Sequence, residues 1–168
     1  MADYDYVLFD TAVFGVAANT EHTLFQVPQG GDATHTEAFT NMRGAGALPA
    51  EEAFRIEEIH VMVDVNGAVA DLQDMWVGNF LEIRIADRTL LKIPLVMAAS
   101  HNEFGGMYTQ ETAADEALIG RKGDGFKLKV PLQLPGGTSF RVRIQQVTAM
   151  SAASQNVKVA LRGTLTMP

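Results

Sequence analysis

The chain has 168 residues, a formal net charge of −7 and no cysteine, which favours one domain and excludes disulfide frameworks, thiolate metal sites and cysteine nucleophiles. Hydrophobic residues make up 47% and charged residues 20%, a balance that excludes a disordered chain. The negative charge argues against phosphate backbones as partners, so we expect no direct nucleic-acid binding. The chain contains no apolar run long enough to span a bilayer, and its acidic start is unlike a signal peptide, so we expect a cytoplasmic protein.

Alternation of apolar and polar residues predicts strands along most of the chain. The first two are expected at 4–14 and 21–27. Residues 28–50 are rich in Gly, Ala and Thr without any period, which predicts a long loop of a kind that is often functional. The next strand is expected at 54–65, where the apolar parity changes at Glu57-Glu58 and predicts a β-bulge.

One short helix is expected at 66–79, followed by a hairpin at 80–97 that turns at Asp87-Arg88. A second long loop is predicted at 98–118. The apolar residues that recur at helical intervals in the predicted helix are Val69, Leu72, Met75 and Trp76.

Three more strands are expected at 126–134, 138–147 and 156–167. Asp124-Gly125 and the Pro135-Gly136-Gly137 run are turn signals between them. The side chains that strand parity directs inward in the second half of the chain are Leu81, Ile83, Ile85, Phe126, Leu128, Val130, Leu132, Leu134, Phe140, Val142, Ile144, Val157, Val159, Leu161 and Leu165.

These elements predict an all-β fold. Roughly eight strands, each apolar on one face and polar on the other, are typical of a single eight-stranded jelly-roll barrel or sandwich. We expect it to span residues 1–168 as one domain, with one short helix and the two long loops at 28–50 and 98–118.

Two strands contain a proline in nearly the same context, "KIPL" around Pro94 and "KVPL" around Pro131. A proline cannot donate a hydrogen bond to a neighbouring strand, so it is tolerated at the edge of a sheet or at a bulge. We therefore predict that both prolines lie where a strand bends or leaves its ladder, each just after an inward residue, Ile93 or Val130. At an edge, such a proline also limits unwanted pairing between molecules.

Histidines are the first candidates for chemistry. His22 and His35 lie near Glu21 and Glu37, a set that could contribute to a metal site of the cupin type. The close pair of histidines that such a site needs is missing. His60, on the polar side of a valine-rich strand, and His101, in a loop beside Asn102 and Glu103, are expected to be structural or solvated.

Other signals of catalysis are weak. The sequence has no nucleophile elbow and no zinc-protease motif, and "GRKGDGF" at 120–126 is a hairpin turn rather than a phosphate loop. General acid–base catalysis needs two carboxylates that converge in a cleft. Glu57 and Glu58 are adjacent on a strand and point to opposite faces, so they do not converge unless the bulge redirects one. We expect solvated charges at all four carboxylate pairs, which are Glu51 with Glu52, Glu57 with Glu58, Asp71 with Asp74, and Asp115 with Glu116. We expect no catalytic, metal-binding or cofactor-binding residues, and no enzyme.

Two groups of side chains could serve in binding. Trp76 is expected in the core, whereas Tyr4 and Tyr6 share a parity and could be exposed together as a sugar platform. Six basic residues point outward from three strands and would form one positive docking face if those strands were neighbours; the other interpretation is a solvated sheet face. They are Lys127, Lys129, Arg141, Arg143, Lys158 and Arg162.

The second half of the chain resembles a protein family. The stretches "LEIRIADRTLLKIPLVM", "FKLKVPLQLPGGTSFRVRIQQV" and "QNVKVALRGTLTM" are similar to single jelly-roll capsid proteins of tailless icosahedral viruses with an internal membrane. The likeness is to the smaller of the two major capsid proteins in the branch with thermophilic bacterial and halophilic archaeal viruses. It covers roughly 54–167, and the run from Val157 to Gly163 matches the family's last strand.

The resemblance implies a structural protein of the virion, assembled in the host cytoplasm. It would associate with itself and with a second major capsid protein, and the shell would lie over an internal membrane, a further candidate partner. The family has no catalytic residues to carry over. Large contact surfaces are what a shell requires, and the loops 28–50 and 98–118 are candidates for them. The alternatives are a non-catalytic binding module of the carbohydrate or adhesin type and a metal-dependent jelly-roll enzyme.

Overall fold

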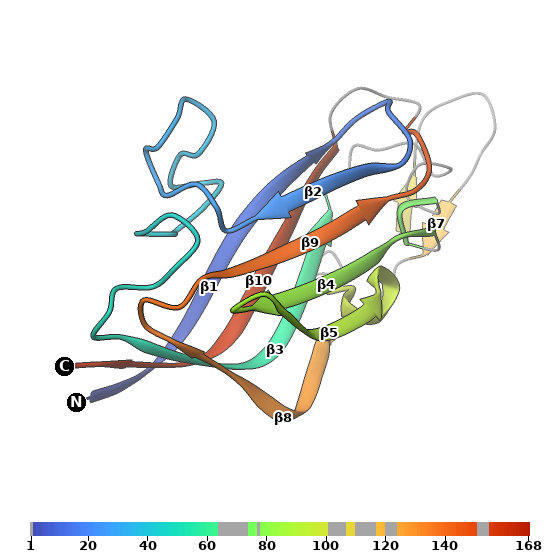
Figure 1. Ribbon diagram of the computed structural model, residues 1–168. Coiled ribbons are helices and arrows are strands. Elements are labelled where there is room, and N and C mark those ends of the chain that lie inside the picture. The colour runs from blue at the N-terminus through green and yellow to red at the C-terminus, as the bar shows by residue number, and fades with distance from the viewer. Residues whose placement is uncertain are drawn as a thin grey trace.

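Two four-stranded antiparallel sheets pack face to face in the computed structural model, which describes residues 2–63, 74–76, 78–100, 107–109, 117–119, 124–150 and 155–168. The first sheet has the order β1-β10-β3-β8 and the second β2-β9-β4-β5. Figure 1 shows the second sheet in front of the first, with both termini side by side at one end. The first sheet comprises β1 (Ala2–Phe14), β10 (Gln155–Met167), β3 (Ala53–Val63) and β8 (Phe126–Pro135). The second comprises β2 (Thr20–Leu24), β9 (Phe140–Gln146), β4 (Phe80–Ile85) and β5 (Arg88–Pro94).

This strand order confirms the predicted jelly roll. Consecutive strands alternate between the sheets at β1, β2 and β3, and again at β8, β9 and β10, so the chain wraps around one core. The connection predicted as a loop at 98–118 contains β6 (Met107–Thr109) and also most of β7 (Ala117–Ile119), which pairs with β6. A 3₁₀ turn, η1 (Leu95–Ala98), follows β5. Of the predicted helix at 66–79, residues 74–76 and 78 are helical, and 66–73 and 77 lie outside the described residues.

The core fills the space between the sheets. β1 contributes Leu8 and Phe14, and β3 contributes Phe54 and Ile59, all of them enclosed. The side chains predicted to point inward and found buried are Leu81, Ile83, Ile85, Leu134, Phe140, Val142, Ile144, Val157, Val159, Leu161 and Leu165. Burying a side chain of this size contributes about 1.5–3 kcal/mol each.

The bulge predicted at Glu57-Glu58 is confirmed. The pairing of β3 with β8 shifts between Ile56 and Glu58, where Ile56 faces Leu132 and Glu58 faces Lys127. Four residues of β8, 128–131, therefore stand opposite Glu57 alone. Val130 lies in this unpaired stretch and is 74% exposed, so the prediction that it points inward is wrong.

Both prolines lie on edge strands, as predicted. Pro94 ends β5, the last strand of the second sheet, and Pro131 lies in the bulge of β8, the last strand of the first. No central ladder therefore loses a hydrogen bond to either ring. The hairpin between β4 and β5 turns at Ala86-Asp87, one residue earlier than predicted, because the register shifts by a residue after Ile83.

Candidate interaction surfaces

The histidine candidates are engaged at separate places. His22 lies on β2, where its ring stacks on Phe14 at 4.4 Å and its Nε2 is 2.9 Å from Oε1 of the buried Gln146. His35 lies in the 28–50 loop and contacts Asp32. Within the described residues, no group of three or more His, Asp or Glu side chains is placed to hold a metal. The structure therefore gives the cupin-type interpretation no support in that part of the chain.

The other two histidine candidates are His60 and His101. His60 is on β3 with its Nε2 3.1 Å from Oε2 of Glu58. This hydrogen bond, aided by the charge of Arg162, holds the pKa of Glu58 below its ordinary value. His60 therefore acts here as a structural partner in a sheet surface. His101 lies outside the described residues.

The candidate aromatic side chains, Tyr4, Tyr6 and Trp76, do not form an open platform. Trp76 is 9% exposed and belongs to the core, as predicted. Tyr6 packs edge-on against the enclosed Phe54, with ring centroids 6.2 Å apart. The prediction that Tyr4 and Tyr6 share an exposed face is therefore wrong for Tyr6, because their parity on β1 directs them toward the core. Tyr4 is 48% exposed because it lies near the end of the strand.

The 28–50 loop covers part of the free edge of β1. Asn41 Oδ1 accepts a hydrogen bond from the Phe9 N–H at 2.8 Å, and Asn41 Nδ2 donates to the Val7 carbonyl at 2.7 Å. The Asn41 N–H donates to the Phe9 carbonyl at 3.2 Å. A single asparagine thus occupies the groups that a neighbouring strand would use. This part of the loop is packed on its own chain rather than extended as an arm.

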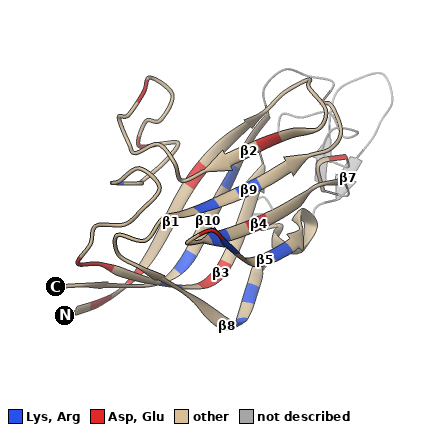
Figure 2. Cartoon of the chain, viewed as in Figure 1, with Lys and Arg blue, Asp and Glu red and all other residues tan. Residues whose placement is uncertain are grey.

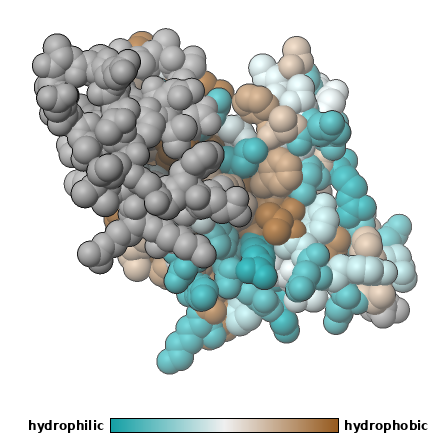
Figure 3. Space-filling view, turned by 180° about the vertical axis from the view of Figure 1, so that it is seen from behind, coloured by the Kyte–Doolittle hydropathy of each residue, from teal (hydrophilic) through white to brown (hydrophobic). Residues whose placement is uncertain are grey.

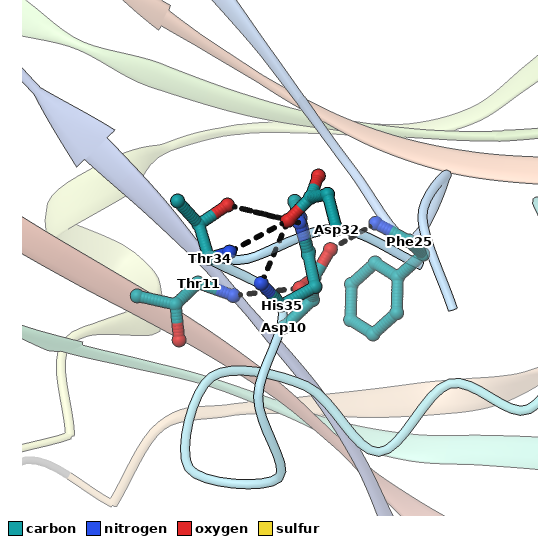
Figure 4. Close-up of polar contacts among 6 residues, drawn as sticks. All are labelled: Asp10, Thr11, Phe25, Asp32, Thr34 and His35. Carbon is teal, nitrogen blue, oxygen red and sulfur yellow. Dashed lines mark hydrogen bonds and ion pairs between the residues drawn. The ribbon is translucent and has the colours of Figure 1, made fainter. Parts of the chain in front are cut away.

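A buried carboxylate anchors the start of the same loop (Figure 4). Asp10 is 2% exposed and accepts hydrogen bonds from the N–H groups of Thr11 and Phe25. Phe25 has φ of 65°, a conformation that costs a non-glycine residue about 1–2 kcal/mol. Its ring is enclosed beside Phe140 at 5.5 Å. The Asp10 hydrogen bond and this packing together hold the chain where β2 ends.

Asp32 organises the outer part of the loop (Figure 4). Its Oδ1 accepts hydrogen bonds from the His35 ring at 2.8 Å and from the N–H and hydroxyl of Thr34 at 2.8 and 2.7 Å. These bonds hold the pKa of the Asp32 carboxyl well below its usual range. The loop predicted as irregular is therefore held by defined local contacts.

Replacement of Asp10 by asparagine should change how stability depends on pH. Burial raises the pKa of Asp10 above its ordinary value of 3.8, against the lowering effect of the hydrogen bonds from Phe25 and Thr11. The folded chain therefore binds this proton more tightly than the unfolded chain, and the contribution of Asp10 to stability rises as the pH falls through its folded pKa. We expect wild type to gain stability relative to D10N between pH 7 and pH 4. Urea unfolding across this pH range measures the difference in the free energy of unfolding between wild type and D10N. A difference that does not change with pH would contradict the prediction.

The six basic residues do not form one face. Lys127, Lys158 and Arg162 belong to β8 and β10 of the first sheet, whereas Arg141 and Arg143 belong to β9 of the second. The outer faces of the two sheets point in opposite directions, so strand parity alone misgrouped these side chains. Figure 2 shows basic residues on both sheets.

An apolar region lies on the outside of the first sheet. Along the outward side of β1, Val7 is 43% and Val13 47% exposed, with the half-buried Phe9 between them. The turn that follows β1 adds Val16 at 62%. Viewed from behind, apolar side chains lie in the middle of this face among polar ones (Figure 3). We call this set, Val7, Phe9, Val13 and Val16, the β1 surface.

No protein-family model matches the chain, and the search of curated protein sequences finds no match either. Among the described residues, none of the helices has the length and apolar character needed to cross a membrane.

Proposed function

We propose that the chain is a structural protein of a viral shell, a single jelly-roll capsid protein. In this role it associates with itself and with a second major capsid protein over an internal membrane. The observation that carries the proposal is the β1 surface, an apolar region on the outside of a jelly roll. Jelly rolls serve in capsids, lectins and cupins, so the fold alone does not decide between them.

The β1 surface favours protein association over the other uses of the fold. Exposed valines in a group mark contact surfaces in soluble proteins, whereas sugar binding relies on exposed aromatic rings. Of the candidate rings, Trp76 and Tyr6 pack against the core. A binding module of the carbohydrate type thus rests on Tyr4, and saturable binding on a glycan array that Tyr4→Ala abolishes would favour that alternative.

The protection of the sheet edges is consistent with assembly through the faces of the sheets rather than through pairing of edge strands. Asn41 covers the middle of the β1 edge, and Pro94 and Pro131 interrupt the β5 and β8 edges. Uncontrolled strand pairing would aggregate a protein held at high local concentration. A shell protein with three of the four edges of its two main sheets protected in this way can bury apolar side chains against neighbours and still form a defined contact.

Sedimentation velocity over a range of concentrations tests the proposal. We expect wild type to form dimers or larger species. Val7→Glu combined with Val13→Lys keeps the net charge and places polar groups in the β1 surface. This variant should weaken association at least tenfold, or about 1.4 kcal/mol.

The matched control is Val96→Glu with Val130→Lys, which alters two exposed apolar residues on η1 and β8 and should associate as wild type does. A wild-type chain that stays monomeric at its highest soluble concentration, and that does not enter particles when produced with its partner capsid protein, would contradict the proposal.

A further inference from the structure

Two arginines face each other on the outside of the second sheet. Arg84 of β4 and Arg141 of β9 are direct partners in the antiparallel register. Like charges in this position repel and destabilise the pair. The Arg141 side chain forms no hydrogen bond or ion pair in the part of the chain that the structure describes.

The carboxylates of this face are already committed. Glu82 is 8% exposed, accepts a hydrogen bond from the Thr89 hydroxyl at 2.7 Å and lies 3.7 Å from both Arg84 Nε and Arg143 Nη1. Glu21 pairs with Arg143. The Nε atoms of Arg84 and Arg143 are nevertheless enclosed without an acceptor. A docking partner cannot reach these enclosed atoms, so the guanidinium that the described carboxylates leave free for a partner is that of Arg141.

This basic face is net positive on an acidic protein. We define it as Arg84, Arg141, Arg143 and Lys92 together with Glu21 and Glu82, four positive and two negative charges on a chain of net charge −7. A guanidinium binds a carboxylate through two parallel hydrogen bonds. The chemistry that completes the face is therefore a group of carboxylates. A phosphate polymer would be repelled by the net charge of the chain.

The same chain carries unpaired carboxylates at the end where its termini lie. Asp5 on β1 and Glu51 just before β3 are exposed and have no ion pair within the described residues. Asp3 is exposed beside them and accepts a hydrogen bond from Thr166 at 2.6 Å. We call Asp3, Asp5 and Glu51 the acidic end; Figure 2 shows acidic residues at this end of the chain.

We propose that the basic face of one copy docks the acidic end of a second copy. The inference rests on the proposed function and specifies one of its contacts. Because different surfaces of the two copies meet, the contact is heterologous, and it can extend from copy to copy as a shell requires. Contacts of this kind contribute to specificity and weaken as salt rises.

Charge reversal at Arg141 tests the proposal by sedimentation velocity at low and high salt. R141E should weaken low-salt association at least tenfold, and it should fold normally because it places a carboxylate opposite Arg84. Circular dichroism and urea unfolding check the fold. The control is K129E, the same charge change at an exposed lysine on β8, which should associate as wild type does.

A charge swap identifies the partner surface. D5R alone should weaken association, and the double variant R141E/D5R should restore it, because each copy then carries both exchanged charges. Association of R141E equal to wild type, an equal loss in K129E, or a double variant no better than the single variants would each overturn the proposal. Binding of a short single-stranded DNA that R141E abolishes would also overturn it and assign the face to phosphates.

The outcomes separate this contact from the proposed function. Association that survives R141E but is lost when Val7 and Val13 are replaced would reject the basic-face contact and support shell assembly through the β1 surface. A wild-type chain that never associates would reject both.

Discussion

Gly163→Ala should destabilise the protein by about 3 kcal/mol or more, enough to leave much of the chain unfolded. A Cβ at Gly163 would lie 1.8 Å from the carbonyl oxygen of Arg55 and 2.9 Å from its carbonyl carbon. Both atoms belong to the backbone of β3, so no side-chain rotation can relieve the clash. β10 lies between β1 and β3 at this point, and the register of β10 with β3 shifts beside Gly163. The alanine would have to push two paired strands apart.

The matched control is Gly15→Ala. A Cβ at Gly15 would have no heavy atom within 4 Å, so this substitution should change the free energy of unfolding by no more than about 0.5 kcal/mol. Urea unfolding followed by circular dichroism measures both variants. Equal midpoints for G163A and wild type would show that β10 and β3 are farther apart at this position than the structure has them.

Gly163 illustrates how much of the fold the sequence predicts. Strand alternation located all eight long strands, and the change of parity located the bulge at Glu57-Glu58. A short phrase ending at Gly163 contributed to the resemblance to capsid proteins. The reason why position 163 needs a glycine could not be predicted from the sequence. The close approach of β3 to β10 depends on which strands are neighbours, and a jelly roll pairs strands that are distant in sequence.

The interaction surfaces depend even more on strand order. Arg141 and Lys158 look alike in sequence, each an outward basic residue on an alternating strand, yet they lie on opposite sheets. The edge-capping role of Asn41 has no local signal in a loop without period. Asp10 did have a local signal in the sequence, because it occupies an inward position between Leu8 and Ala12, where a polar residue needs a hydrogen-bond partner.

Leu134→Ala should cost about 2–5 kcal/mol of stability, whereas Val130→Ala should change it by no more than about 0.5 kcal/mol. Both residues belong to β8, and strand parity directs both inward. The structure separates them, since Leu134 has no exposed surface and Val130 is 74% exposed. Removing the Leu134 side chain leaves a cavity in the core, while the Val130 side chain already contacts water.

The difference between these two variants depends on the bulge. Without it, residues of the same parity on β8 would share one face, and both truncations would be costly. With four residues of β8 opposite Glu57 alone, the strand leaves its ladder around Pro131 and turns Val130 outward before it pairs again at Leu132. Urea midpoints of the two alanine variants test this geometry directly. Similar losses in both would mean that β8 runs straight along β3 and that Pro131 interrupts a continuous ladder.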